Sequence, residues 1–553
     1  MDVVLVGLPG SGKTAVGKRL ATRHGATFVD LDERIEHEAG ARIPQIFEAE
    51  GEAGFRARER TAIADLGPGD SGPVVRRIIA PGGGAIVDPR NRWQLYRGRT
   101  VIWLDGRPEV LAQRLRRSPN VRPLVQGRDP IGTLRELSEA RGRFYAAGRR
   151  VRGVAELQSV VDAVDAEVAA AAREGDAAHG TTLLAAETRI GRIVIGDGIA
   201  ATSLMAALQA LEARRALIVT EPGAWAAVGA DIEAALAAAG LPIERGDFPP
   251  GEAAKSMRVI EAAARELARM HVERGEPIVA IGGGALGDAA GFLAATYLRG
   301  LPLIHVPTTL VAQVDSSIGG KTAVDLPEGK NLVGAFHQPV AVIIDVRLLR
   351  DLPERELRAA LGEVVKMAAL GDERLFELLE ADGAAIARGD AQAFERGAVA
   401  EAVERAAWAK VETVLADERE ADRRISLNLG HSIGHAVEAA AEYRDLRHGE
   451  AVAVGLRGAC RIGVAMTETP PERAARIERL LDALGLARDP LPLSADAVLQ
   501  ALSADKKHAA GRMRWVLPTA DGWTVRDNVP DELVASTVAG LLLPAAAATG
   551  ARA

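Results

Sequence analysis

Short apolar runs alternate with segments of helical periodicity over roughly the first 150 residues. The runs VVLVG, ATFVDLD, RRIIAPGGG and TVIWLDG are typical of buried strands, and GKTAVGKRLATRH between the first two is typical of a helix. This alternation predicts a parallel sheet covered by helices. From about residue 151 to residue 180, an Ala-rich amphipathic stretch followed by polar residues predicts a closing helix and then a linker.

A second α/β pattern begins at Gly191. GRIVIGDG, RRALIVT, GEPIVAIGGG and LPLIHVPTTL predict further buried strands, whereas the pattern after about residue 348 is almost wholly helical. RMRWVLPTADGWTV near the end predicts a hairpin. We therefore expect an α/β protein in five segments: domains at 1–165, 183–347 and 348–540, a linker at 166–182 and a flexible tail at 541–553.

The composition narrows the class of protein. The chain has 553 residues, 48% of them hydrophobic and 26% charged, which is ordinary for a soluble globular protein. A net charge of −7 argues against a general nucleic-acid or membrane-surface partner, because such proteins usually present a basic face. The single cysteine, Cys460, allows no internal disulfide, and no apolar run reaches the ~18 residues that span a bilayer. We expect a cytoplasmic protein that acts on small molecules.

A phosphate-binding loop stands between the first predicted strand and helix. GLPGSGKT, residues 7–14, matches G-x-x-x-x-G-K-[ST], in which backbone N–H groups turn toward the phosphates of a nucleotide. Lys13 can bridge the β- and γ-phosphates, and Thr14 can hold Mg²⁺. The expected ATP-binding residues of the loop are Gly10, Ser11, Gly12, Lys13 and Thr14. The loop does not name the phosphate acceptor, although the lack of an NKxD sequence disfavours a GTPase.

Polar residues after this loop suggest the acceptor. Asp30 and Asp32 lie at the end of the second predicted strand, where their spacing places both carboxylates on one face. One carboxylate can support Mg²⁺ and the other can accept hydrogen bonds from substrate hydroxyls. A single arginine usually lies solvated at a surface, but three arginines together with a glycine turn favour an anionic, hydroxylated acceptor, because guanidinium pairs with carboxylate. The residues concerned are Arg56, Arg122, Arg141 and the turn Gly82–Gly84.

With these motifs in this order, residues 1–165 resemble shikimate kinase. The resemblance implies that shikimate is held by Asp32, Arg56, Arg141, Gly82, Gly83 and Gly84. It also implies that Arg122 reaches the transferring phosphoryl group from a mobile lid, that Asp30 lies near Mg²⁺, and that Arg116 or Arg117 stacks on adenine. Asp32 would orient and deprotonate the attacking hydroxyl, with Lys13 and Arg122 neutralising phosphoryl charge. A gluconate-type kinase is the alternative, but Asp32 with two arginines favours a carboxylated cyclitol.

Three histidines in the last third of the chain suggest a metal site. His431 and His435 share a helical face in RRISLNLGHSIGHAVE, and His448 follows in RHGEAVAVG. A zinc protease is disfavoured, because Ser432 stands where that motif requires glutamate. Glu363 and Lys366 lie on one face of another predicted helix, and two histidines with one glutamate suit Zn²⁺ with an open position. These residues alone do not decide which two histidines are the ligands.

Cationic and amide side chains embedded in Gly- and Ser-rich turns suit a phosphorylated, polyhydroxylated substrate. They include Lys321, Lys330, Asn331, Lys410, Arg424, Asn428, Lys506 and Lys507. A glycine cluster, IGGGALGDAAGF, contains G-x-G-x-x-G at Gly282, Gly284 and Gly287, which by itself only weakly indicates a dinucleotide.

Residues 183–535 resemble 3-dehydroquinate synthase, because the chain contains GEAAKS, GGGALGDAAGF, VPTTLVAQVDSSIGGKT, KNLVGAF, EVVK, RRISLNLGHSIGHAVE and HGE in that order. The resemblance implies Zn²⁺, or Co²⁺, on Glu363, His431 and His448, with His435 on the substrate side. It implies NAD on Glu252, Lys255, Gly283, Gly284, Asp288, Thr308, Thr309, Asp315, Lys321 and Lys330. It further implies a substrate pocket of Lys321, Asn331, Lys366, Lys410, Arg424, Asn428, His435 and Lys506.

Two further residues follow from this resemblance. Arg299 is expected to reach the substrate phosphate from a partner subunit, in a homodimer formed by the second half of the chain. The family often has Thr-Asp after its second strand, where this chain has VTEPGAW, so Glu221 is expected to replace the aspartate that holds a ribose.

Together the resemblances imply a P-loop kinase sheet, then an α/β dinucleotide-binding domain, then a mainly helical metal-binding domain. The expected function is bifunctional: phosphorylation of shikimate by ATP with Mg²⁺, and NAD- and Zn-dependent cyclisation of a heptulosonate phosphate to 3-dehydroquinate. The alternative is a kinase fused to another sugar-phosphate cyclase, such as an inosose or valiolone synthase. Arg424, Asn428 and His435 favour dehydroquinate synthase. A scaffold protein with an inactive kinase domain is disfavoured by intact Lys13, Thr14, Asp30 and Asp32.

Overall fold

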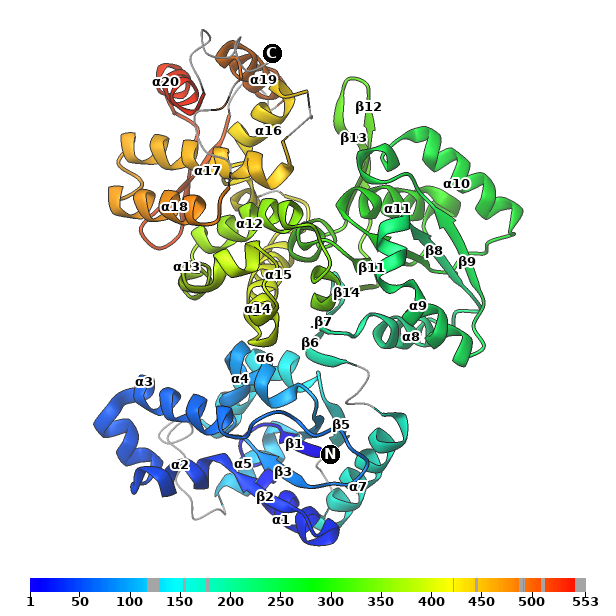
Figure 1. Cartoon of the computed structure of the whole chain (residues 1–553), viewed down its shortest axis with the longest axis vertical. Helices are drawn as coiled ribbons and strands as arrows, with labels where there is room; N and C mark the ends of the chain where they lie inside the picture. Colours follow the sequence, from blue (N-terminus) through cyan, green and yellow to red (C-terminus); the bar gives the residue numbers. More distant parts are fainter. Residues whose placement is uncertain are drawn as a thin grey trace. The chain divides into compact units, whose positions relative to one another are not determined.

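The computed structural model describes residues 1–116, 129–152, 156–175, 180–420, 422–442, 446–486, 491, 493–508 and 513–542, the last five residues of the 493–508 segment by their backbone only. The chain forms two compact units (Figure 1), one of residues 1–188, 192–203 and 343–345 and the other of the remaining residues. Among the helices that the structure describes, none combines the length and apolar character needed to cross a bilayer.

A five-stranded sheet of order β2-β3-β1-β4-β5 forms the centre of the N-terminal domain. Its strands are β1 (Asp2–Val6), β2 (Thr27–Asp30), β3 (Arg77–Ala80), β4 (Thr100–Asp105) and β5 (Arg149–Arg152). All neighbours run parallel; Val3, for example, pairs with Ile78 on one side and Thr100 on the other. The sheet predicted from the first four strands is confirmed. Strand β5 escaped prediction because only Val151 in RRVR is buried.

Helices α1 (Lys13–His24) and α7 (Leu157–Glu174) pack on this sheet. Val16 and Leu20 of α1 meet Val160 and Val164 of α7 in one buried cluster with the strands. Helix α7 continues through the boundary expected at residue 165, and Val168 belongs to the same core. The other helices of the domain are α2 (Leu31–Ala39), α3 (Ile43–Ala64), η1 (Ala85–Val87), α4 (Pro89–Tyr96), α5 (Pro108–Arg116) and α6 (Pro130–Tyr145).

The expectation that Asp30 and Asp32 share a strand face is wrong. Strand β2 ends at Asp30, whose carboxylate accepts hydrogen bonds from the backbone N–H groups of Asp32 at 3.1 Å and Glu33 at 3.4 Å. An aspartate in this position stabilises the first turn of a helix, because it satisfies N–H groups that have no partner within the helix. Asp32 therefore lies in the first turn of α2.

The next sheet has seven strands in the order β6-β7-β14-β11-β10-β8-β9. They are β6 (Thr181–Thr188), β7 (Gly191–Asp197), β8 (Ala216–Thr220), β9 (Ile243–Asp247), β10 (Ile278–Gly282), β11 (Leu303–Pro307) and β14 (Ala341–Asp345). Strands β14, β11, β10, β8 and β9 are parallel neighbours. The four strands predicted here are β7, β8, β10 and β11. A separate antiparallel hairpin joins β12 (Lys321–Leu326) to β13 (Gly329–Phe336).

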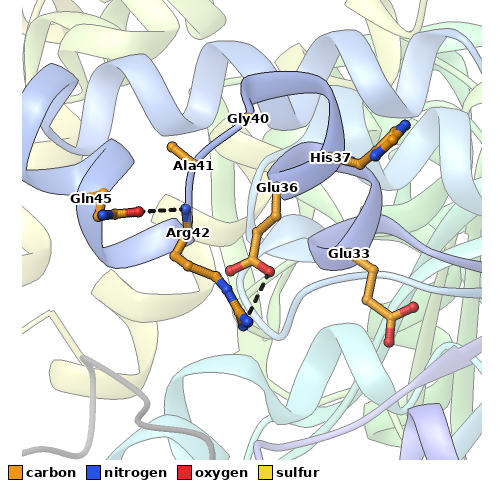
Figure 2. A pocket seen from close by; sticks show the side chains of 7 residues that line it. All are labelled: Glu33, Glu36, His37, Gly40, Ala41, Arg42 and Gln45. Atoms are coloured by element: carbon orange, nitrogen blue, oxygen red, sulfur yellow. Dashed lines mark hydrogen bonds and ion pairs between the residues drawn. The ribbon is translucent and has the colours of Figure 1, made fainter.

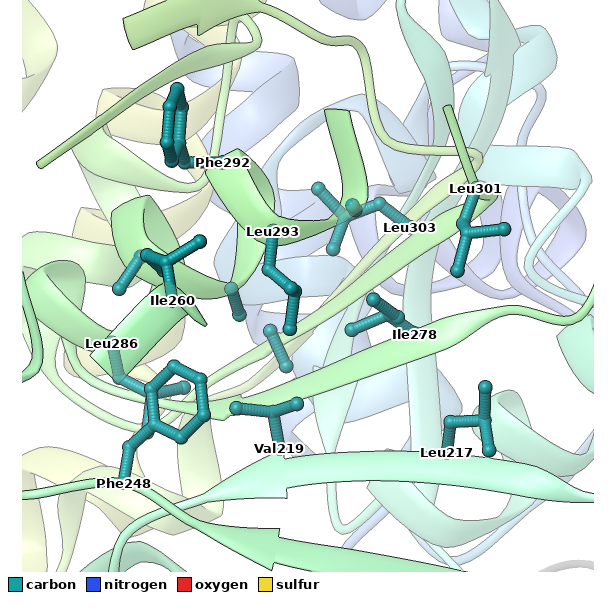
Figure 3. Packing of buried hydrophobic residues seen from close by; sticks show 14 of the residues in the cluster. Leu217, Val219, Phe248, Ile260, Ile278, Leu286, Phe292, Leu293, Leu301 and Leu303 are labelled. Atoms are coloured by element: carbon teal, nitrogen blue, oxygen red, sulfur yellow. The ribbon is translucent and has the colours of Figure 1, made fainter. Parts of the chain in front are cut away.

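The core of this α/β region lies between the strands and two helices (Figure 3). Leu217 and Ile278 from the strands pack with Leu286 and Leu293 of α11 (Gly284–Thr296) and Ile260 of α10 (Met257–Arg269). This packing fixes the N-terminus of α11 at the carboxyl end of β10. The remaining elements are α8 (Ala200–Ala210), α9 (Pro222–Ala238), η3 (Gly251–Ala254), η4 (Tyr297–Arg299), η5 (Ala312–Ser316) and η6 (Val346–Leu349).

The rest of the chain is mainly helical, as predicted. Its elements are α12 (Glu354–Ala369), α13 (Glu373–Ala387), α14 (Ala391–Glu395), α15 (Ala398–Ala416), η7 (Arg423–Asn428), α16 (His431–Ala440), α17 (His448–Ala465), α18 (Pro471–Ala483), α19 (Ala495–His508) and α20 (Asp531–Leu541). The predicted hairpin is confirmed as β15 (Trp515–Pro518) paired with β16 (Trp523–Arg526).

Candidate active sites

The phosphate loop connects β1 to α1 in the N-terminal domain. Gly10 and Gly12 have φ of +82° and +96°, a region that favours glycine. Lys13 Nζ donates to the carbonyl of Gly7 at 2.9 Å, and Thr14 Oγ1 donates to Asp30 Oδ2 at 2.7 Å. A hydroxyl beside a carboxylate offers the oxygen ligands that Mg²⁺ prefers. The two predicted magnesium ligands therefore lie together at the loop and fit that ion.

The predicted shikimate-binding side chains converge on the turn Gly82–Gly84. A Cβ at Gly82 would lie 2.7 Å from Asp32 Oδ1, and one at Gly84 would lie 2.9 Å from a guanidinium nitrogen of Arg56. Arg141 Nη1 donates to the carbonyl of Gly83 at 2.6 Å. Glycines at this turn thus leave room for the side chains of one carboxylate and two guanidinium groups. Such a set can hold hydroxyls and a carboxylate of one small ligand.

Two residues at this turn were not predicted. Glu59 is 2% exposed and accepts from Arg56 Nη1 at 2.8 Å. Burial raises the pKa of Glu59, and Arg56 only partly opposes that effect. Tyr145 donates from its hydroxyl to the Gly83 carbonyl at 3.3 Å. Glu59 follows Arg56 by three residues on α3, a spacing that could have indicated the ion pair.

A polar groove of about 460 Å³ lies where α2 meets α3, and Figure 2 shows the side chains that line it. Its lining consists of Glu33, Glu36, His37, Gly40, Ala41, Arg42 and Gln45. Arg42 lies 3.8 Å from Glu36, and its backbone N–H donates to Gln45 Oε1 at 2.9 Å. These interactions stabilise the turn that connects α2 to α3. The groove contains none of the residues predicted to bind shikimate or ATP.

Glu363 of α12, His431 of α16 and His448 of α17 come together in the helical region. Their ligand atoms lie within 4.8 Å of one another. His448 Nε2 lies 3.1 Å and His431 Nε2 3.4 Å from the same oxygen, Glu363 Oε1. Burial alone would raise the pKa of Glu363, but Lys366 and His431 hold it well below its ordinary value. The carboxylate is thus ionised between two imidazoles.

The hydrogen bonds of the two histidines test whether a cation fits here. His431 Nδ1 lies 3.2 Å from the carbonyl oxygen of Leu429, and His448 Nδ1 lies 3.1 Å from Glu438 Oε2. Because both Nδ1 atoms face acceptors, each imidazole can keep a proton on Nδ1 while a cation beside Glu363 takes the lone pair of Nε2. Three electron-pair donors then face one point, an arrangement that a divalent cation such as Zn²⁺ satisfies. The predicted ligand set fits the metal.

Glycines let the three ligand-bearing helices approach closely. A Cβ at Gly455 of α17 would overlap the carbonyl oxygen of Gly430, which precedes His431. A Cβ at Gly362, next to Glu363, would overlap the carbonyl oxygen of Gly449, next to His448. Backbones therefore touch directly beside each predicted metal ligand, and the separation of these three side chains depends on the glycines.

Buried charges surround the candidate metal site. Lys366, fully buried, forms an ion pair with Glu363 and lies 3.8 Å from Asp315. Lys410 Nζ donates to Asp315 Oδ1 at 2.5 Å. Burial raises the pKa of Asp315, but the two lysines outweigh it and lower the pKa to about 2. Asp315, which the resemblance assigns to NAD, is thus the counter-ion of two lysines assigned to the substrate.

Other predicted pocket residues lie in the same unit. His435 lies beside both histidine ligands, with ring centroids 5.1 Å from His431 and 5.9 Å from His448. Arg424 is 1% exposed and donates to the carbonyls of Gly319 and Glu418. Lys321 donates to Glu420 Oε2 at 2.6 Å. Asn428 ends the short helix η7, just before α16, which carries His431.

The predicted dinucleotide-binding residues gather around the N-terminus of α11. Gly283 stands as the N-cap of that helix, and a Cβ there would lie 3.3 Å from Thr309. Glu221 Oε1 lies 3.5 Å from the N–H of Gly283 and Oε2 lies 3.4 Å from the N–H of Gly251. A Cβ at Gly284 would lie 2.8 Å from Ser316 Oγ. Glu221 therefore reaches the loop at the N-terminus of α11, a position at which α/β proteins commonly bind nucleotides.

A buried lysine links this loop to the β12–β13 hairpin. Lys255 is 4% exposed and donates to Asp288 Oδ2 at 2.8 Å and to Asn331 Oδ1. Burial raises the pKa of Asp288 to about 6, against the opposing effect of Lys255. Lys330 donates to Glu252 Oε1 at 3.1 Å, and Thr308 N–H to the Gly282 carbonyl at 3.0 Å. Asn331, expected on the substrate side, thus lies among the residues expected to bind NAD.

Six predicted residues are not brought to these sites by the described structure. Arg116 is exposed at the end of α5, and Arg117 and Arg122 lie outside the described residues. Lys506 lies on α19, but its side chain is outside the description, as is that of Lys507. Arg299 is exposed in η4 with φ of +68°. Its role in a partner subunit stays a prediction.

Three family models match consecutive parts of the chain. The shikimate kinase model matches residues 9–169, the model of the 3-dehydroquinate synthase N-terminal region matches 246–359, and that of the C-terminal region matches 360–508. The 3-dehydroquinate synthase of Symbiobacterium thermophilum is 45% identical over 355 residues, which are 62% of this chain and 95% of that protein.

Two solved structures are similar to the second region. One is 2-epi-5-epi-valiolone synthase from Streptomyces hygroscopicus with NAD⁺ and Zn²⁺ bound, at a TM-score of 0.59 and 28% identity, covering 63% of this chain and 96% of that one. The other is a 2-deoxy-scyllo-inosose synthase complexed with carbaglucose-6-phosphate, NAD⁺ and Co²⁺, at a TM-score of 0.56 and 26% identity, with the same coverage. Identity is higher with the dehydroquinate synthase, so another cyclase is not favoured. The chain belongs to the 3-dehydroquinate synthase family and carries an N-terminal shikimate kinase domain at residues 9–169.

Proposed function

We propose that this chain catalyses two reactions of aromatic amino acid and chorismate biosynthesis at separate sites. The N-terminal domain phosphorylates shikimate to shikimate 3-phosphate with ATP. The second region converts 3-deoxy-D-arabino-heptulosonate 7-phosphate to 3-dehydroquinate with release of phosphate. The family matches at 9–169 and 246–508 support this pair of activities.

The kinase proposal is supported most directly by the convergence of Asp32, Arg56 and Arg141 on the Gly82–Gly84 turn. Arg56 and Arg141 would hold the substrate carboxylate, and Asp32 would orient the attacking hydroxyl and accept its proton. Bound Mg²⁺ would lie on Thr14 and Asp30 and neutralise phosphate charge. Lys13 would stabilise the charge that spreads over the transferring phosphoryl group.

The cyclase proposal is supported most directly by the three donors on Glu363 Oε1, His431 Nε2 and His448 Nε2. These residues would hold Zn²⁺ or Co²⁺, and the loop at Gly283 with Lys255 and Asp288 would hold NAD⁺. When bound, NAD⁺ accepts and returns a hydride while the metal polarises the substrate oxygen.

The surrounding side chains would control charge and protons in that reaction. Lys366 and Lys410 lie within 4 Å of Asp315, so their ammonium groups are held in fixed positions in which they can bind oxyanions of the substrate. His435, beside both histidine ligands, is the proposed proton-transfer group. Lys321, Asn331, Arg424 and Asn428 are proposed to orient the substrate, and Arg299 of a second copy to bind its phosphate.

One pair of variants tests both activities in the purified full chain. Lys13→Ala should abolish formation of ADP from ATP and shikimate, yet leave phosphate release from the heptulosonate phosphate with NAD⁺ and Zn²⁺ intact. Glu363→Gln should abolish phosphate release from the heptulosonate phosphate and leave formation of ADP from ATP and shikimate intact. Each variant is thus the folding control for the other. A parent chain that binds zinc and NAD⁺ but releases no phosphate would overturn the cyclase assignment.

A homodimer and a cytoplasmic location are also proposed. The dimer is supported by the resemblance and by Leu332 and Phe336, whose exposures of 54% and 50% on β13 are high for large apolar residues. Light scattering that gives the mass of one chain at assay concentration would contradict it. The reducing cytoplasm is supported by the single, buried Cys460, and cell fractionation tests it.

A further inference from the structure

Both ring nitrogens of His448 face carboxylate oxygens. Nε2 lies 3.1 Å from Glu363 Oε1, and Nδ1 lies 3.1 Å from Glu438 Oε2. Glu438 stands on α16, two turns after His431, and is 6% exposed. A buried carboxylate needs a donor, and His448 supplies one across the contact between α16 and α17.

The two proposed histidine ligands differ in the acceptor that their Nδ1 atom faces. His431 Nδ1 faces a backbone carbonyl, that of Leu429, in the turn before its own helix. His448 stands in the first turn of α17, and its Nδ1 faces the carboxylate of a different helix. A carboxylate that accepts the Nδ1–H bond fixes the ring orientation and makes Nε2 a stronger electron-pair donor.

We propose that Glu438 is a positioning residue for the metal site, which sets the tautomer and direction of His448 so that Nε2 faces Glu363. The inference rests on the proposed metal-dependent function. Nothing in the family resemblance above assigns a role to Glu438.

A competing arrangement uses the same side chains. Ligand atoms of His435, Glu438 and His448 also lie within 4.8 Å of one another. In that set His448 would bind the ion through Nδ1 and lose its bond to Glu438. Its Nε2 would then face the ionised Glu363 without an ion between them. The Glu363 set leaves both Nδ1–H groups satisfied, so the structure favours Glu438 as support and Glu363 as ligand.

The test is the Zn²⁺ dissociation constant of the full chain, measured by competition with a coloured chelator without substrate or NAD⁺. Glu438→Ala should weaken Zn²⁺ binding about 10- to 100-fold, as loss of such a partner does at other zinc sites. Glu438→Gln keeps an oxygen that can accept from Nδ1 and should recover much of the affinity. Glu404→Ala is the matched control, because Glu404 of α15 is also 6% exposed but is not among the residues of either candidate ligand set.

Two further readouts separate the outcomes. The visible spectrum of bound Co²⁺ should change in Glu438→Ala, whereas the thermal midpoint of the metal-free chain should fall no more than in Glu404→Ala. Unchanged zinc affinity in Glu438→Ala, or a loss as complete as that in His448→Ala, would overturn the proposal. If His448→Ala itself leaves zinc affinity unchanged, the proposed metal site fails and not only the role of Glu438.

Discussion

Gly449 of α17 packs so closely against Ala359 of α12 that a Cβ at Gly449 would overlap the Ala359 carbonyl oxygen. Because this contact lies between backbones, no side-chain rotation can relieve it. The two helices carry Glu363 and His448, so the distance between the helices sets the distance between two proposed metal ligands.

Gly449→Ala should therefore weaken both metal binding and folding. Overpacking of this kind costs about 1–3 kcal/mol of unfolding free energy. We expect the Zn²⁺ dissociation constant to rise more than tenfold, because metal ligands tolerate displacements of only about 0.2 Å. Gly223→Ala is the control: Gly223 is also helical, but a Cβ there meets no atom within 4 Å. Equal zinc affinities in the two variants would contradict the role of this contact.

Asp32→Asn should abolish shikimate phosphorylation but leave ATP binding intact. Asp32 adjoins the Gly82 turn, whereas the phosphate loop is a separate element. Loss of a group that orients and deprotonates the nucleophile typically reduces kcat about 10²- to 10⁴-fold. Glu33→Gln, which removes the next carboxylate along α2 and its ion pair with Lys18, should retain turnover. Retained turnover in Asp32→Asn would remove that residue from the mechanism.

Contiguous motifs predicted much of both sites. The phosphate loop, the Gly82–Gly84 turn and the histidines of α16 carry their chemistry in short segments, so their residues could be found without knowledge of the tertiary structure. Glu438 could not be found that way. It stands in the run HAVE, where a helical glutamate is usually solvated, and only the packing of α17 on α16 brings it to His448.

Errors in the predicted secondary structure arise where local hydrogen bonding outweighs the pattern of apolar residues. The apolar pattern continues through Leu31 and so predicts that Asp32 lies on a strand, but Asp30 caps a helix that starts one residue later. Besides β6, β12, β13 and β14, the pattern does not predict β5 and β9, most of whose side chains are charged or exposed. Their backbones extend because the neighbouring strand offers hydrogen bonds, which sequence periodicity does not reveal.

Asp288 should make the free energy of unfolding depend on pH in the cofactor-free chain. Its pKa in the folded chain, about 6, lies above the ordinary value of 3.8, so the folded chain holds a proton that the unfolded chain releases. Stability should therefore fall as pH rises between these two values, by on the order of 3 kcal/mol.

Urea titrations at pH 4, 5, 6 and about 7 check this expectation. Asp288→Asn cannot titrate, so the stability of the parent relative to that variant should decline across the range. If the difference in unfolding free energy between the parent and Asp288→Asn stays constant with pH, the Asp288 carboxylate titrates normally. Asp325→Asn, which removes a second carboxylate near Lys255, tests whether the effect belongs to Asp288.

Arg424→Lys should destabilise the chain although the charge is kept. The guanidinium donates to the Gly319 carbonyl at 3.2 Å and the Glu418 carbonyl at 2.6 Å, while 1% of the residue is exposed. An ammonium group cannot span both acceptors, so one buried carbonyl loses its partner at a cost of about 1–3 kcal/mol. Arg423→Lys, at an exposed position in the same turn, should change neither stability nor activity. If Arg424 only holds the backbone, Arg424→Lys should lower the melting temperature and leave KM for the heptulosonate phosphate unchanged. A raised KM, measured at temperatures where the variant is folded, would instead place the guanidinium in the substrate pocket.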